Sequence, residues 1–164
     1  AHVAPDTPVD LAGIAREIVD SLTLMARERD VTLALKTPRE ALQVPGDRDE
    51  LLRLMENLVE NAIKYGKPGG EVAITVETGE SEASFSVRDH GPGIAPEHLP
   101  RLTERFYRVD TAASRETGGT GLGLAIVKHI VLRHRGRLTI ESKPGEGATF
   151  RAILPRFAAG HANG

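Results

Sequence analysis

Hydrophobic residues in the first part of the chain are spaced as on the buried face of a helix. After Thr7 and Pro8, a predicted cap and a proline of the first helical turn, apolar side chains recur every three or four positions from Leu11 to Met25. Residues 47–65 repeat this spacing, and the aspartate that opens them has a glutamate three positions later, as in a capping pair. The pattern predicts two long helices, the second of which ends where glycine and proline become frequent.

Alternating apolar and polar residues predict strands in much of the remaining chain. The first strand, Val31–Leu35, is expected to pair with a short segment around residues 42–44. Four more strands are expected to form two hairpins, with strands 72–76 and 83–87 joined by the turn Thr78–Ser81, and strands 137–142 and 148–154 joined by Pro144–Gly147.

A long segment without a strand pattern separates the two hairpins. Residues 91–121 are rich in glycine, proline, arginine and threonine, and a connection of this length is typical of a functional loop or lid. An apolar helix is expected at residues 122–132, ended by Gly136 as its C-cap. The order of elements predicts an α+β fold, a two-layer α/β sandwich with helices on one face of a mixed, mostly antiparallel sheet.

Composition excludes several classes of function. The 164 residues are 40% hydrophobic, enough for one core, and the net charge of −2 lacks the basic excess expected of a nucleic-acid-binding protein. Without cysteine there is no disulfide framework and no thiolate chemistry. The apolar runs fall far short of the roughly 20 residues of a membrane span, so we expect this chain to be soluble. It begins at Ala1 rather than with methionine, so we expect it to be a piece of a longer protein.

Three polar side chains share one stripe of the second predicted helix. Asn57, Asn61 and Lys64 are spaced i, i+4 and i+7, so they fall on one face while apolar residues cover others. A solvated helix surface explains this stripe as well as a polar binding site does. Two asparagines in one helix are slightly unusual, because asparagine is a mediocre helix former, but this alone does not indicate a site. The stripe alone leaves both interpretations open.

Two glycine-containing segments are candidates for ligand contacts. Asp89 closes a predicted strand, and Gly91 and Gly93 after it would let a flat ligand approach the backbone, although an aspartate that only forms a turn is the alternative. Gly118–Gly123 precedes the apolar helix and would present backbone N–H groups to a phosphate. This segment is neither a Walker P-loop nor a dinucleotide fingerprint, since it lacks the lysine of the first and the third glycine of the second.

Five motifs follow one another in the segments Glu56–Tyr65, Asp89–Ile94, Glu104–Arg108, Gly119–Leu124 and Gly145–Phe150. In this order they resemble the Asn box, the first glycine box, the phenylalanine box and the second and third glycine boxes of one family. It is the catalytic ATP-binding domain of bacterial sensor histidine kinases, in the Bergerat-fold superfamily that includes DNA gyrase, Hsp90 and MutL. The stretch from the phenylalanine box onward most resembles the PhoR-type, phosphate-sensing kinases.

The resemblance implies roles at the phosphate end of a nucleotide. Asn61, assisted by Asn57, would offer amide oxygens to Mg²⁺. Lys64 and Tyr65 would face the phosphates or the ribose, and Arg108 would reach the γ-phosphate during transfer. The catalytic residues implied in this way are Asn57, Lys64 and Arg108. Backbone donors to the phosphates and lid hinges would come from the second glycine box: Gly119, Thr120, Gly121, Leu122 and Gly123.

The resemblance also implies roles at the base. Asp89 would accept a hydrogen bond from the adenine amino group; guanine has a carbonyl there, so ATP should be preferred over GTP at a difference of at least about 1–3 kcal/mol. Thr149 would contact the base region through water. The remaining residues of this set are Gly91, Gly93 and Ile94 next to the base, and Phe106, which would anchor the lid or belong to an ordinary core.

The residue at position 57 separates branches of this superfamily. The resemblance implies that hydrolytic members, and serine kinases that act on anti-sigma antagonists, carry glutamate there. An amide cannot accept a proton from water or a hydroxyl, whereas a neutral histidine is already nucleophilic, so Asn57 favours phosphotransfer to histidine. Glu56 and Glu60 are expected to face solvent or to act as caps. Two alternatives stay open: a non-catalytic ATP-binding regulatory module, and an ATP-hydrolysing clamp domain.

The histidine that would accept the phosphate is not expected in this chain. None of the six histidines is followed by Glu or Asp, as the family's acceptors are. His129 and His134 are five positions apart and do not share a helical face, which argues against a metal site. We expect a monomeric catalytic domain over residues 1–156, with a lid at about 94–118 and a disordered tail at 157–164.

The resemblance places the partners in other domains. The parent protein would be a homodimer that carries a dimerisation and phosphoacceptor domain, from which phosphate passes to the receiver domain of a response regulator. Nucleic acid is not expected as a partner. The parent would be anchored in the bacterial inner membrane, with this domain in the cytoplasm.

Overall fold

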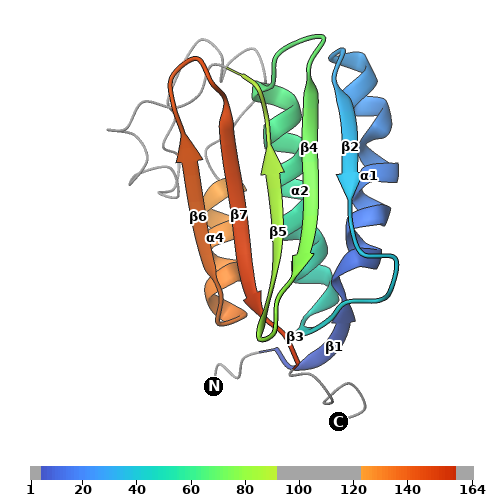
Figure 1. The fold of residues 1–164 in the computed structure, drawn as a ribbon, viewed down its shortest axis with the longest axis vertical. Coiled ribbons are helices and arrows are strands. Elements are labelled where there is room, and N and C mark those ends of the chain that lie inside the picture. Colours follow the sequence, from blue (N-terminus) through green and yellow to red (C-terminus); the bar gives the residue numbers. More distant parts are fainter. Residues whose placement is uncertain (1–4, 92–122, 158–164) are drawn as a thin grey trace.

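The computed structural model describes residues 5–91 and 123–157 (Figure 1). The elements follow the chain in the order β1 (Thr7–Asp10), α1 (Leu11–Glu28), β2 (Thr32–Lys36), β3 (Gln43–Gly46), α2 (Arg48–Tyr65), β4 (Glu71–Thr78), β5 (Glu82–Arg88), α4 (Gly123–Arg133), β6 (Arg137–Ser142) and β7 (Ala148–Pro155).

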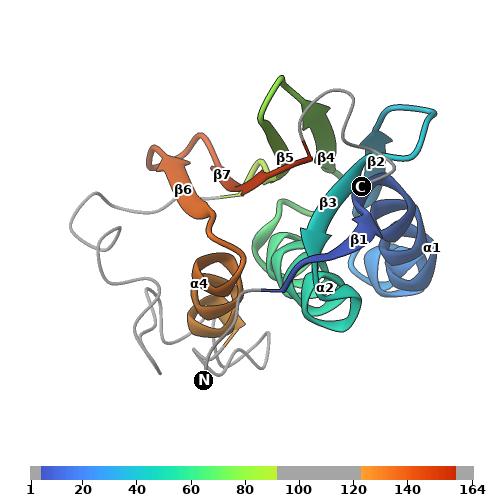
Figure 2. The same cartoon turned by 90° about the horizontal axis from the view of Figure 1, so that it is seen from below.

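Five strands form one sheet in the order β2-β4-β5-β7-β6. The β2–β4 pair is parallel, and the three other pairs are antiparallel. The helices α1, α2 and α4 lie together on one side of this sheet (Figure 2). The predicted two-layer α+β sandwich with a mixed, mostly antiparallel sheet is therefore confirmed, as are the two predicted hairpins.

The core lies between the sheet and the helices. Alternate residues of β4, β5 and β7 are buried, which confirms the faces predicted from alternation. Ile74 of β4 stands opposite Val87 of β5, which in turn stands opposite Phe150 of β7. Against them pack the buried faces of the helices. Among the residues described, no helix combines the length and the apolar character that crossing a membrane requires.

The predicted start of the first helix is wrong. Thr7 and Pro8 belong to β1, which pairs antiparallel with β3, and α1 begins at Leu11. Asp10 occupies the N-cap position in an extended conformation, but its Oδ1 accepts a hydrogen bond from the N–H of Leu42 (3.1 Å) instead of capping the helix. Pairing with a distant strand overrode the local cap signal.

The predicted pairing of the first alternating strand with residues 42–44 is also wrong. β2 pairs in parallel with β4, with Leu33 opposite Val72, while β3 pairs with β1. A parallel pair needs a long crossover connection, and the 18-residue helix α2 between β2 and β4 supplies it. The sequence pattern predicted the strand but not its neighbour.

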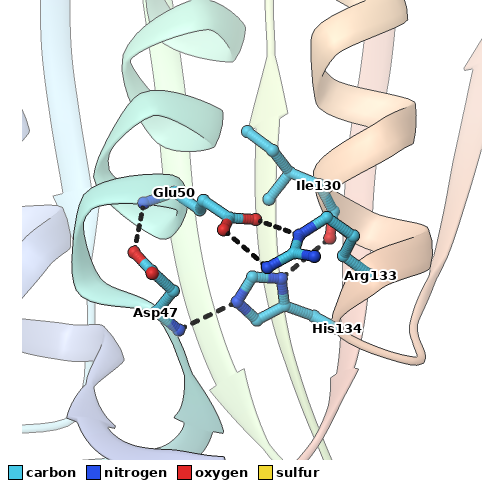
Figure 3. A network of polar contacts seen from close by, with 5 residues as sticks. All are labelled: Asp47, Glu50, Ile130, Arg133 and His134. Carbon is cyan, nitrogen blue, oxygen red and sulfur yellow. Dashed lines mark hydrogen bonds and ion pairs between the residues drawn. The ribbon is translucent and has the colours of Figure 1, made fainter. Parts of the chain in front are cut away.

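The start of α2 confirms half of the predicted capping pair. The side chain of Asp47 accepts a hydrogen bond from the N–H of Glu50 at 3.0 Å. The reciprocal bond of a capping box is replaced: the N–H of Asp47 donates to Nε2 of His134, and the carboxylate of Glu50 binds Arg133 (Figure 3). Both side chains that take part come from the end of α4.

α4 ends close to the predicted position before Gly136, but Gly136 does not act as the predicted helix cap. The left-handed residue after the helix is Arg135, with φ of 60°, and not the glycine. Gly136 is needed because a Cβ atom there would overlap the carbonyl oxygen of Ile153 in β7. The glycine serves a close approach between backbones rather than a helix cap.

Candidate functional site

The polar stripe of α2 lies against the start of α4. Asn57, Asn61 and Lys64 are half-buried, on the side of the helix that faces away from the core. Gly123 is the first residue of α4, and a Cβ atom added to it would come within 3.5 Å of Oδ1 of Asn57. The structure thus joins the stripe to the end of the second glycine box, which a merely solvated helix face would not require.

The electrostatics of this junction favour an anion. The first four N–H groups of a helix have no acceptor within the helix, and they carry a partial positive charge. Lys64 adds a full positive charge on the neighbouring helix, one turn beyond Asn61. The amide oxygens of Asn57 and Asn61 are hard donors that suit a divalent cation with bound phosphate. Such a mixed set of donors and charges fits a metal-bound polyphosphate.

Asp89 lies at the end of β5 and is only 4% exposed. Its N–H donates to the carbonyl oxygen of Ala148 at 2.9 Å, and its Oδ1 accepts a hydrogen bond from the N–H of Gly91 at 2.9 Å. The main chain of Asp89 is therefore held by β7, and its carboxylate is oriented by the N–H of Gly91. A buried and oriented carboxylate of this kind is a mark of a functional site, because burying the charge lowers stability.

Burial raises the pKa of Asp89 above its ordinary value. Backbone hydrogen bonding at Gly91 and Ala148 and the charge of His90 act in the opposite direction, but less strongly. The raised pKa means that the ionised carboxylate is less stable in its folded environment than in water. A ligand that donates a hydrogen bond to this carboxylate would recover part of that loss.

Glycines let three segments meet at Asp89. A Cβ atom on Gly91 would overlap the carbonyl oxygen of Tyr65, the last residue of α2. A Cβ atom on Gly147, which has φ of +82°, would overlap the carbonyl oxygen of Asp89 itself. The end of α2, the end of β5 and the β6–β7 turn are thus packed backbone to backbone. Sequence reasoning missed Gly147 as a site residue, although its place in the third glycine box was a usable signal.

Thr149 is half-buried in β7, directly opposite Arg88 in the ladder and one residue after Ala148, which holds Asp89. Of the predicted base end of the site, Asp89 and Gly91 come together. Thr149 shares the outer face of the sheet with exposed Arg88, because successive residues of a strand face opposite sides. The predicted phosphate end is represented by Asn57, Asn61, Lys64, Tyr65 and Gly123. The remaining predicted site residues lie outside the described parts of the chain, as does the expected lid at about 94–118: Gly93, Ile94, Phe106, Arg108, Gly119, Thr120, Gly121 and Leu122.

Two glutamates flank the stripe on α2. Glu56 and Glu60 are half-buried rather than fully exposed to solvent. Burial raises the pKa of Glu60, the neighbouring Glu56 raises it further, and Lys64 opposes both. The positive charge of Lys64 therefore acts on the acidic side of α2, at Glu60.

Comparison with known proteins identifies the family. Residues 46–158 match the family model for the histidine kinase-, DNA gyrase B-, and HSP90-like ATPase. The chain belongs to this family. Phosphate regulon sensor protein PhoR of Pseudomonas aeruginosa is 46% identical over 143 residues, which are 87% of this chain and 32% of PhoR. The chain spans about a third of the length of the curated relatives it matches.

Solved structures agree with this assignment. The mycobacterial sensor histidine kinase MprB aligns with a TM-score of 0.77 and 30% identity, over 92% of this chain and 97% of that one. Full-length ShkA in complex with AMPPNP aligns with a TM-score of 0.79 and 29% identity, over 95% of this chain and 32% of ShkA. The motif-based assignment to a histidine-kinase-type ATPase domain, with a PhoR-type likeness, is confirmed, and ATP is the ligand of the family.

The burial of Asp89 predicts a pH-dependent stability effect. The pKa of Asp89 is higher in the folded chain than in the unfolded chain, where it is about 3.9. Protonated Asp89 therefore favours the folded state, and this stabilisation is lost as pH rises from about 3.9 through the folded pKa. Asp89→Asn should therefore unfold at higher denaturant concentration than the wild type at pH 7, and the difference should shrink as pH falls below about 4. Urea unfolding at several pH values measures this.

The matched control is Asp20→Asn, the same change on the exposed side of α1. It should leave the urea midpoint close to that of the wild type at each pH. A lower stability of Asp89→Asn at pH 7 would contradict the conclusion that ionised Asp89 is costly to bury.

Proposed function

We propose that this chain is the catalytic domain of a sensor histidine kinase, which binds Mg-ATP and transfers the γ-phosphate to a histidine of its parent protein. The observation that carries the proposal is the pairing of two ends of one site: the buried carboxylate of Asp89 at the tip of β5, and the amide stripe of α2 against the start of α4. One end suits a base with an amino group, and the other suits a metal-bound triphosphate.

Adenine recognition depends on a single acceptor. The Asp89 carboxylate is fixed by the N–H of Gly91 and shielded from solvent, so it accepts a hydrogen bond from the 6-amino group of adenine. Guanine presents a carbonyl oxygen at this position, which would leave both acceptors buried and unpaired.

The phosphates are proposed to bind at the junction of α2 and α4. Lys64 and the N–H groups at the start of α4 would neutralise their charge, and Asn57 and Asn61 would hold Mg²⁺ through their amide oxygens. When bound, Mg²⁺ supplies charge neutralisation at the β- and γ-phosphates. Arg108, outside the described residues, is the side chain proposed to stabilise the charge that develops during transfer.

The acceptor is proposed to be a histidine because α2 carries no base at the position of Asn57. A neutral imidazole has a lone pair on its unprotonated nitrogen, which forms the new N–P bond as the bond from the γ-phosphorus to the bridging oxygen breaks and ADP leaves. A hydroxyl or water would first have to lose a proton to a base, and the Asn57 amide cannot take it. The relatives reported above are sensor kinases, which favours this reading over a hydrolysing clamp or a regulatory module.

The whole protein's partners are part of the proposal. The accepting histidine lies on a dimerisation domain of a homodimeric parent, and the phosphate passes to an aspartate of a response regulator. The present chain is proposed to be monomeric, to extend as one domain over residues 1–156 and to close over the nucleotide through a lid at about 94–118. The parent is proposed to be anchored in the bacterial inner membrane, with this domain on the cytoplasmic side.

Base recognition predicts a loss of nucleotide discrimination in Asp89→Asn. The wild type should bind AMPPNP with Mg²⁺ more tightly than GMPPNP, and the variant should lose about tenfold or more of the AMPPNP affinity, because the amide offers the adenine amino group an N–H instead of an acceptor. Isothermal titration calorimetry measures both affinities, with Asp20→Asn as the control that should match the wild type. Equal discrimination in Asp89→Asn and the wild type would refute the role given to Asp89.

Metal binding predicts a magnesium-specific effect at Asn61. Asn61→Ala should lower the affinity for AMPPNP in magnesium by about tenfold but leave the weaker binding in EDTA unchanged, because only the metal-dependent part of the binding uses the amide oxygen. Asn61→Asp should restore magnesium dependence, since a carboxylate is also an oxygen ligand. An equal loss in magnesium and in EDTA would show that Asn61 does not act through the metal.

Phosphotransfer is tested with the parent's dimerisation domain. ATP labelled at its γ-phosphate should transfer the label to this added domain, as an acid-labile and alkali-stable product expected of phosphohistidine, and replacement of the acceptor histidine by glutamine should abolish the product. Nucleotide binding without transfer would favour the regulatory module instead. Steady phosphate release by this chain alone would favour the hydrolysing clamp.

A further inference from the structure

An ion pair joins the start of α2 to the end of α4, far from the nucleotide site. Nε of Arg133 donates to Oε1 of Glu50 at 2.8 Å, and Nη2 donates to Oε2 at 2.9 Å (Figure 3). The two parallel bonds make the pair bidentate, and the side chains are only 32% and 26% exposed. Such a pair fixes both the distance and the angle between the groups it joins.

A buried histidine supports the same contact from behind. His134 is 3% exposed; its Nδ1 donates to the carbonyl oxygen of Ile130 at 2.8 Å, and its Nε2 accepts a hydrogen bond from the N–H of Asp47 at 3.1 Å. These two partners match the tautomer that carries its proton on Nδ1. It fits closely against Gly46, where a Cβ atom would come within 3.0 Å of Cδ2 of the ring.

The two helices run antiparallel between this contact and the site. Glu50 lies in the first turn of α2 and meets the last residue of α4, whereas Asn57, two turns later, lies beside Gly123 at the start of α4. At about 1.5 Å per residue, α4 extends roughly 15 Å from Arg133 back to Gly123. Because α4 is one continuous helix, a shift of Arg133 along α2 would also shift Gly123 relative to Asn57.

Hydrophobic packing alone does not set this register strictly. Only Val127, Ile130 and Val131 of the 11 residues of α4 are buried. Leu124 and Ile126 also pack, partly buried, against the core. Apolar contacts are non-directional, so they restrict the position of α4 along α2 without specifying it as a directional bond does. The hydrogen bonds of Arg133 and His134 add that directional constraint.

We propose that the Glu50–Arg133 ion pair is a positioning element of the nucleotide site, which sets the register of α4 against α2 so that the first turn of α4 meets Asn57. This inference rests on the proposed function, because it assigns the pair a role in binding the phosphates. Glu50 and Arg133 touch neither nucleotide nor metal. They act through the helix that carries Gly123, and His134 supports them.

The position of the pair predicts a loss that depends on the phosphates. Arg133→Gln should weaken binding of AMPPNP with Mg²⁺ by about tenfold but leave the affinity for adenosine within about twofold of the wild type, because adenosine uses the base end at Asp89 and lacks the groups that meet α4. Calorimetry measures the first affinity and an NMR titration the second, both on the whole chain, well below its unfolding temperature.

Arg137→Gln is the matched control. Arg137 also forms two bonds to a glutamate, Glu82, at 2.8 and 3.3 Å, but this pair lies on the sheet and joins neither α2 nor α4. The control should leave both affinities unchanged. The exchanged pair Glu50→Arg with Arg133→Glu should recover most of the AMPPNP affinity that each single charge reversal loses, which a general loss of stability would not do.

The outcomes separate the two proposals. If the wild type binds AMPPNP and Arg133→Gln binds it equally well, the positioning role is wrong and the proposed function stands. An equal loss of AMPPNP and adenosine affinity would also overturn positioning, because it would indicate a damaged fold. If the wild type binds no nucleotide, the proposed function fails and the positioning role fails with it.

Discussion

Backbone packing around Asp89 holds the base end of the site in place. Gly91 leaves no room for a side chain against the carbonyl of Tyr65, and Gly147 leaves none against the carbonyl of Asp89. The end of α2, the tip of β5 and the β6–β7 turn therefore approach one another at points where no side chain fits. Since burial also raises the pKa of the carboxylate, the fold keeps an ionisable group where it costs stability. Natural sites accept such a cost where binding requires it.

α2 connects the two ends of the molecule. Its C-terminal residue meets Gly91 beside the carboxylate, its middle carries the amide stripe, and its first turn carries Glu50, which binds the end of α4. The same helix supplies a large part of the core through its opposite face. A helix buried on one side and half-covered on the other is well suited to hold polar groups at fixed positions, because packing restricts its motion.

Much of this organisation could be read from the amino-acid order, because it is local. The periodicity of α2, the alternation of β4 and β5, and the glycines beside Asp89 all depend on neighbours in sequence. The wrong predictions concern pairing between distant segments. Thr7 and Pro8 form a strand because they pair with β3, and β2 pairs with β4 across an intervening helix. The bonds from Arg133 and His134 to residues more than 80 positions away carry no local signal. The glycine box marks Gly147 as a site residue, but its contact with Asp89 is not visible from its neighbours in sequence.

The sheet order has a consequence for how the chain acquires its site. β5, which ends at Arg88 directly before Asp89, takes β7, the last strand that the structure describes, as its second neighbour, and the Asp89 N–H donates to the carbonyl oxygen of Ala148, 59 positions downstream. During synthesis from the N-terminus, the tip of β5 has no partner on that side until β7 has left the ribosome. Contacts of such high sequence separation form late and slowly. A nascent chain should therefore be unable to capture a nucleotide until β7 has been made.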